Sequence, residues 1–144
     1  MTPCVRELRI TYTSTSATGP LPRLGGPGSA AEILLARLQH EPVEVCVVLL
    51  VNTKHRLLGI HELGRGTLDM CLVHPRDVFK AAILANAAGV IVGHNHPSGE
   101  PEPSADDVAL CARLRNAATI IGIDLLDFII VGDGRYCSFK EMGR

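Results

Sequence analysis

The stretch VEVCVVLLV, residues 43–51, restricts the possible folds of this chain more than any other feature. Only Glu44 interrupts a run of β-branched and other apolar side chains. A strand of this composition is buried on both faces, and the run is far too short to cross a bilayer. GVIVGH (89–94) and IDLLDFIIVG (123–132) predict two further buried strands.

Segments with helical spacing alternate with these strands. Ser29 is expected to cap a helix over residues 30–40, Pro75 to begin a second helix that continues over 76–88, and residues 104–122 to form a third. Because strands and helices interleave, the chain is predicted to be a layered α/β domain with a mixed sheet. Weaker patterns predict an edge strand at 5–12, a strand at 56–63 ending near Glu62, a turn at 64–66, and strands at 67–73 and 135–139.

Length and composition predict one globular unit. The chain has 144 residues, 47% of them apolar and 20% charged, which excludes general disorder. We expect residues 1–42 to supply an N-terminal strand, a flexible loop and a helix that pack on a domain formed by 43–144. Five scattered cysteines without a C-x-x-C pair indicate buried, reduced thiols. The N-terminus has no apolar signal segment, so a cytoplasmic protein without membrane contact is expected.

The charge balance argues against nucleic acid as a direct partner. The formal net charge is −1 and aromatic residues make up 3%, so the chain lacks both an overall basic footprint and stacking platforms. A local basic patch, for instance around Arg113 and Arg115, stays open.

The segment HNHPSGEPEPSADD, residues 94–107, carries the strongest chemical signal. Side chains alternate along a strand, so His94 and His96 are expected on one side of it. The loop that follows leads to a helix whose first turn holds Asp107, where the helix dipole favours an ionised carboxylate. Two imidazoles and one carboxylate leave a coordination position open, as in catalytic zinc sites.

The same residues also fit a purely structural role. S-x-x-D before an apolar run is a helix-capping motif, with Ser104 at the N-cap and Asp107 three residues later. Asp106 carries charge at the same helix start, and a shift of one residue would make it the ligand in place of Asp107.

H-x-H, seven residues and S-x-x-D resemble the signature of the JAMM (MPN+) metallopeptidases at His94, His96, Ser104 and Asp107. The wording HNHPSGEPEPSADD resembles the RadC branch, bacterial JAB-domain proteins historically labelled DNA repair proteins. The likeness extends from about Val43 to Gly143.

This resemblance implies a three-layer α/β/α, cytidine-deaminase-like JAB/MPN fold and one Zn²⁺ per chain held by His94, His96 and Asp107. It further implies catalysis by Glu62 as proton acceptor and Ser104 at the oxyanion. His61, beside Glu62, is expected to point to the opposite face and is the second candidate. The implied reaction is hydrolysis of an amide bond in a protein or peptide, such as a ubiquitin-like substrate.

The sequence departs from the RadC pattern at two points. Relatives commonly have Asp-His where this chain has Asp127-Phe128, which leaves any role of that imidazole in doubt. Full-length relatives usually carry an N-terminal helix-hairpin-helix domain, and this chain is too short to contain one. Substrate identity and a homodimer stay open.

Four other functions compete with hydrolysis at a zinc site. The main alternative is a non-enzymatic RadC-type protein associated with DNA repair or recombination. A facial triad of non-haem iron would use the same three residues, although the spacing argues against it. A zinc deaminase lacks its P-C-x-x-C ligands, and a cysteine hydrolase lacks a base near any cysteine.

Overall fold

A mixed sheet of five strands forms the centre of the computed structural model, which describes residues 1–9, 11, 13, 19–66 and 73–144. The strand order is β2-β1-β3-β4-β5. Only the pair β3–β4 is parallel, and the other three pairs are antiparallel. The strands are β1 (Val45–Val51), β2 (Leu57–Arg65), β3 (Gly89–Asn95), β4 (Asp124–Gly132) and β5 (Arg135–Ser138).

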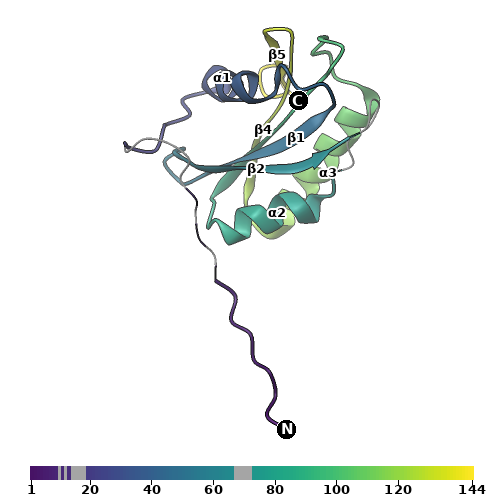
Figure 1. Cartoon of the computed structure of the whole chain (residues 1–144). Coiled ribbons are helices and arrows are strands. Elements are labelled where there is room, and N and C mark those ends of the chain that lie inside the picture. The colour runs from purple at the N-terminus through teal and green to yellow at the C-terminus, as the bar shows by residue number, and fades with distance from the viewer. Residues whose placement is uncertain (10, 12, 14–18, 67–72) are drawn as a thin grey trace.

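Helices cover both faces of this sheet, as Figure 1 shows. Helix α1 (Pro27–Leu38) lies on one face, and α2 (Pro75–Leu84) and α3 (Ala105–Ile121) lie together on the other. Alternate residues of β1 therefore enter two separate cores, with Val47 on the α1 side and Cys46 on the α2/α3 side. All seven residues of β1 are buried, which confirms the strand and the layered α/β class.

The close packing of α1 on β3 depends on Gly93. A Cβ atom at this position would lie 2.6 Å from the methyl groups of Leu34 on α1. Carbon atoms pack at about 3.5 to 4.0 Å, so a side chain at this position would require the buried Leu34 side chain or the helix to move. Gly93 thus lets the helix lie directly on the strand that carries His94.

Several boundaries differ from the sequence predictions. Helix α1 begins at Pro27 with Gly26 as N-cap, and Ser29 lies inside its first turn, where its Oγ donates to the Gly26 carbonyl at 2.8 Å. Strand β2 runs through the predicted turn to Arg65, because a bulge between Cys46 and Val47 lets Gly64 pair with Cys46.

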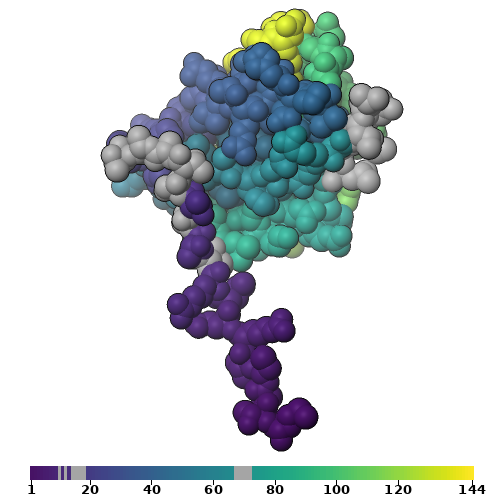
Figure 2. Space-filling model, viewed as in Figure 1, coloured from purple at the N-terminus to yellow at the C-terminus, as the bar shows by residue number. Residues whose placement is uncertain are grey.

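The N-terminal segment lies outside the sheet. Residues 5–9 and 11 of the predicted edge strand 5–12 form no strand, and the segment before residue 10 projects from the rest of the molecule in Figure 2. The predicted strand at 67–73 falls almost wholly outside the described residues. Among the described cysteines, Cys46 and Cys111 are buried while Cys4 is exposed. None of the helices in the described ranges combines the length and the apolar character that a membrane crossing requires.

Asp127 is a buried carboxylate with a structural function. One of its oxygens accepts hydrogen bonds from the backbone N–H groups of Phe128 and Lys140, at 2.7 and 3.0 Å. The other oxygen accepts a hydrogen bond from the Ser138 hydroxyl at 2.6 Å. These bonds compensate the cost of burying the charge and fasten the C-terminal segment to β4.

Candidate metal centre

His94 and His96 lie where β3 reaches the edge of the sheet. The His94 side chain is 2% exposed, and its ring meets the edge of Phe128 at a centroid distance of 5.5 Å. His96 follows the last strand residue, and its ring lies 5.0 Å from that of His94. The expectation that both imidazoles face one side of the strand is confirmed by this contact. Phe128 forms an apolar wall beside His94.

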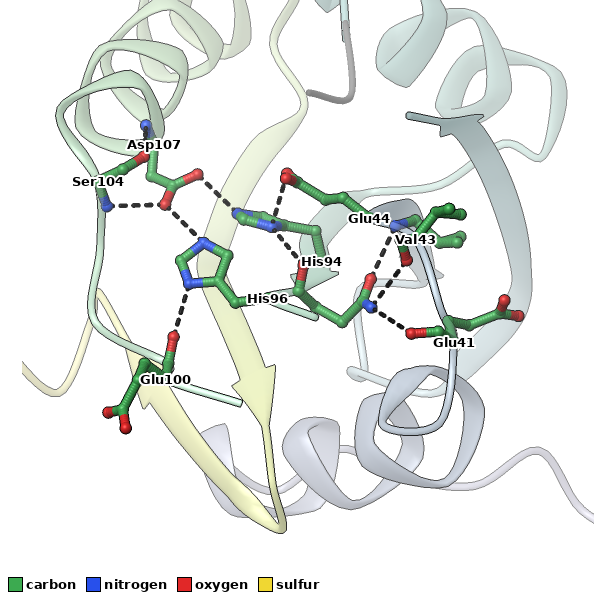
Figure 3. A network of polar contacts seen from close by, with 10 residues as sticks. Glu41, Val43, Glu44, His94, His96, Glu100, Ser104 and Asp107 are labelled. Atoms are coloured by element: carbon green, nitrogen blue, oxygen red, sulfur yellow. Dashed lines mark hydrogen bonds and ion pairs between the residues drawn. The ribbon is translucent and has the colours of Figure 1, made fainter. Parts of the chain in front are cut away.

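Helix α3 brings Asp107 to these rings. Its Oδ1 lies 2.8 Å from His94 Nε2 and its Oδ2 lies 3.1 Å from His96 Nε2. Ser104 is the N-cap of the helix, and the two residues exchange backbone-to-side-chain hydrogen bonds of 2.8 and 3.1 Å. Figure 3 shows how the cap holds the carboxylate against both rings. Capping and presentation of the carboxylate are therefore combined in one arrangement.

Backbone and carboxylate oxygens fix which ring nitrogens carry protons. His96 Nδ1 lies 2.7 Å from the Glu100 carbonyl oxygen. His94 Nδ1 lies 3.1 Å from Glu44 Oε1 and 3.4 Å from the Asn95 carbonyl oxygen. Since a carbonyl oxygen can only accept, both Nδ1 atoms carry hydrogen, and in neutral rings both Nε2 atoms present lone pairs. These lone pairs point into the space occupied by the Asp107 carboxylate.

The Nε2 atom of His94 has no directed hydrogen bond although it is buried. Its 2.8 Å contact with Asp107 is close enough for an ion pair but is out of line for an N–H···O bond. Buried polar nitrogens are rarely left in this state. Donor atoms that share one cation point toward the cation and not toward each other, and this geometry fits such a cation.

The electrostatics of the group point the same way. Burial lowers the pKa of His94, but the close carboxylates of Asp107 and Glu44 outweigh burial and raise that pKa from 6.5 to about 9. Burial raises the pKa of Asp107, and its close contacts with both histidine rings hold it well below its ordinary value instead. Negative potential at this edge therefore favours positive charge on the rings or between them.

The three residues can hold a metal ion. One ligand atom from each of His94, His96 and Asp107 lies within 4.8 Å of the others. Two imidazole nitrogens and one carboxylate oxygen are a donor set that suits first-row metals such as zinc, and it leaves coordination positions open. Asp106, the alternative ligand, is exposed and is not part of this group.

Glu44 is the residue of this site that the sequence analysis did not single out. It directly precedes β1, whose Cys46 pairs with His94, and its side chain is 21% exposed. Asn95 holds the backbone on either side of Glu44 against β3. Its Oδ1 accepts a hydrogen bond from Val45 N at 2.7 Å, and its Nδ2 donates to the Val43 carbonyl at 3.0 Å. The sequence did carry a signal for Glu44, because it is the only charged residue in the otherwise apolar stretch 43–51.

Glu62 is not brought to the three ligand residues. Its carboxylate lies 2.9 Å from the Arg65 guanidinium and is 37% exposed. Glu62 pairs with Val47, whose side chain enters the core under α1, whereas His94 pairs with Cys46 of the opposite core. Residues directly opposite in an antiparallel pair share a face, so Glu62 lies on the other face of the sheet from His94. His61 lies on the same face as His94 but is exposed.

A three-layer α/β/α domain with two imidazoles and a helix-borne carboxylate at one sheet edge defines a class of candidate metal-binding domains. The sequence profile of one family, the RadC-like JAB domain, matches residues 24–144, and the chain belongs to this family. The fold and the motif resemblance at residues 94–107 agree with that membership.

Curated relatives carry names that state no activity. A UPF0758 protein of Nitrosococcus oceani is 48% identical over 120 residues, which cover 83% of this chain and 54% of the relative. UPF0758 proteins of Symbiobacterium thermophilum and Clostridium beijerinckii are 43% and 40% identical, over 89% and 84% of this chain and 56% and 53% of theirs. The chain thus spans about half the length of the curated relatives it matches.

Proposed function

We propose that this domain is a zinc-dependent hydrolase of the JAMM type that cleaves an amide bond in a protein or peptide substrate. The observation that carries the proposal is the convergence of His94 Nε2, His96 Nε2 and an Asp107 oxygen, with the buried His94 nitrogen lacking a directed partner. Zinc held by His94, His96 and Asp107 would lower the pKa of a bound water to about 7 and polarise a carbonyl group.

Glu44 supplies the proton-transfer group in this proposal, in place of Glu62. Its carboxylate lies 3.1 Å from Nδ1 of His94, one of the three candidate metal ligands, and it is partly accessible to solvent. In this proposal the Glu44 carboxylate, which contacts His94 Nδ1 in the structure, turns toward the Nε2 atoms, accepts a proton from the attacking water and delivers it to the leaving amine. Glu62, on the other face and paired with Arg65, has no such path.

Ser104 stabilises the oxyanion in the same proposal. Its Oγ accepts a hydrogen bond from Asp107 N at 3.1 Å, so the hydroxyl hydrogen is left to donate. A donor aimed at developing negative charge contributes through preorganisation.

An extended substrate is proposed to reach the site along β2. This strand is at one end of the sheet order, and its residue Gly64 pairs with Cys46, which in turn pairs with His94. A peptide strand added to a free sheet edge gains main-chain hydrogen bonds and is held extended for cleavage. A protein tail of the ubiquitin-like kind has this shape.

A pair of glutamine variants tests the catalytic assignment. Wild type, Glu44→Gln and Glu62→Gln are compared on a panel of ubiquitin-like fusions and unfolded peptides, with zinc content measured for each. We expect Glu44→Gln to lower kcat about 100- to 10,000-fold with zinc retained, and Glu62→Gln to keep nearly full activity. Full activity in Glu44→Gln would reject its role.

The alternative of a non-enzymatic role in DNA repair makes a different prediction. It requires no hydrolysis by wild type on any substrate of the panel, together with salt-dependent DNA binding that survives chelation of the metal.

A further inference from the structure

The far end of β1 carries a fixed, cationic turn. The seven residues of β1 extend from Val45 at the metal edge to Val51, so the turn at residues 52–55 lies roughly 20 Å from the metal edge. Asn52 Oδ1 accepts hydrogen bonds from the backbone N–H groups of Lys54 and Arg56, at 2.9 and 3.0 Å. His55 N donates to the Asn52 carbonyl at 3.0 Å, which closes the turn. The cations Lys54 and Arg56 therefore stand on ordered backbone.

Arg23 and Arg56 form an opposed pair of like charges. They are antiparallel bridge partners, held by Leu24 N donating to the His55 carbonyl and Leu57 N donating to the Pro22 carbonyl, both at 2.8 Å. Directly opposed side chains project to one side with Cβ atoms about 5 Å apart, and like charges there repel. No carboxylate of the described residues forms an ion pair with Arg23, Lys54 or Arg56. A bound anion would relieve this repulsion.

Two hollows share His55 in their linings. One, of about 380 Å³, is lined by Arg23, Thr53, Lys54, His55 and Arg56. The other, of about 160 Å³, has His55 in its lining together with the apolar side chains of Leu24, Val51, Ile91 and Leu126. A cavity of about 150 Å³ with an apolar lining holds one benzene ring. Space for a single ring therefore lies beside space lined by cations.

The acidic residue that lines the smaller hollow, Asp127, does not line the larger, cationic one. Both of its carboxylate oxygens are engaged by Phe128, Ser138 and Lys140. Lys140 also lines the smaller hollow. The smaller hollow thus combines apolar and polar residues, and the larger is lined by Arg23, Lys54 and Arg56.

We propose that the two neighbouring hollows bind a nucleotide, with its ring in the smaller hollow and its phosphate between Arg23, Lys54 and Arg56. A guanidinium group binds phosphate with charge-assisted hydrogen bonds, and Arg56 would do so with the N–H groups that are left by its bond to the Leu21 carbonyl at 2.9 Å. The small ring space favours a mononucleotide over a nucleic acid strand, since binding of a strand uses successive aromatic platforms and none of the described residues that line either hollow is Phe, Tyr or Trp. The site is separate from the metal centre and does not depend on hydrolysis.

Calorimetric titration of the purified protein with UMP, uridine and inorganic phosphate tests this site. We expect UMP to bind at least ten times more tightly than either fragment, because only UMP uses both hollows. Arg23→Gln and Lys54→Gln should each weaken UMP about tenfold or more. Arg113→Gln is the matched control, since it removes the same charge from an exposed position on α3, behind the other face of the sheet, and we expect less than a twofold change.

Three results would overturn the assignment. The first is an equal loss of UMP binding in Arg113→Gln, which would mean attraction by net charge alone. The second is phosphate binding as tightly as UMP, which would leave the smaller hollow without a function. The third is absence of UMP binding at millimolar concentration while a short oligonucleotide binds, which would make this a nucleic-acid surface.

Discussion

The two ends of the interior strand β1 have opposite electrostatic character. At the end that begins with Val45, two histidines and the carboxylates of Asp107 and Glu44 gather in a largely buried group whose inner atoms are acceptors. At the end beyond Val51, Arg23, Lys54 and Arg56 gather in exposed positions without a carboxylate partner among the described residues.

This difference shows how one strand can carry a group that lacks a cation at one end and a group that lacks an anion at the other. Burial makes the acceptor group at the metal edge costly unless a cation or protons fill it. The exposed cations at the other end cost little free energy of folding, because water screens their charges. A bound anion is therefore not needed for folding there, although the cations favour its binding. Substitutions at the metal edge should therefore have large effects on metal binding and on the free energy of unfolding, whereas substitutions at the cationic end should have small effects on the free energy of unfolding.

Loss of the shared carboxylate is expected to have the largest effect. Asp107→Asn keeps the shape of the side chain but removes the charge that faces both Nε2 atoms. We expect zinc affinity to fall more than about 100-fold, as seen by metal content and by competition with a chromogenic chelator.

The neighbouring residue supplies the control for that substitution. Asp106→Asn removes one charge from the same helix turn, but Asp106 is exposed and outside the metal group. Zinc content should stay at one ion per chain in this variant. UMP binding should be unchanged in both variants if the two ends are independent. Equal zinc loss in both variants would instead point to a general charge effect or to Asp106 as ligand.

Asn95 holds the metal edge to the start of β1, and its loss should have the next largest effect. Its side chain satisfies Val45 N and the Val43 carbonyl, and it is 2% exposed. Asn95→Ala leaves buried backbone groups without partners, so we expect a loss of about 3 kcal/mol in the free energy of unfolding. Urea denaturation measures it, with Asn116→Ala on the exposed face of α3 as control. Similar midpoints for both variants would show that Asn95 does not anchor this edge.

The sequence predicted those parts of the molecule in which local chemistry decides the structure. The strand, loop and helix around His94, His96 and Asp107 were predicted because strand alternation and the Ser104 cap are both local signals. The start of α2 after Pro75 was predicted for the same reason. Each of these features depends on residues close together in the chain.

The face occupied by Glu62 and the position of Glu44 could not be predicted in this way. Both depend on how β1 pairs with its neighbours, including the register shift between Cys46 and Val47. A shift of one residue transfers a side chain to the other face, and nothing within β2 alone records it. The pairing of the two arginines could not be predicted either, because Arg23 and Arg56 are 33 positions apart and are joined by an isolated bridge.

Ser104 should give the smallest effect on stability, and it separates capping from catalysis. Ser104→Ala removes the acceptor for Asp107 N, so the free energy of unfolding should fall by about 1 kcal/mol. Ser104→Asp restores an N-cap acceptor and should recover most of that stability, but it has no hydroxyl to donate. If the hydroxyl stabilises an oxyanion, both variants lose activity about 10- to 100-fold while zinc content stays constant. If Ser104 only caps α3, activity follows stability, and Ser104→Asp regains both.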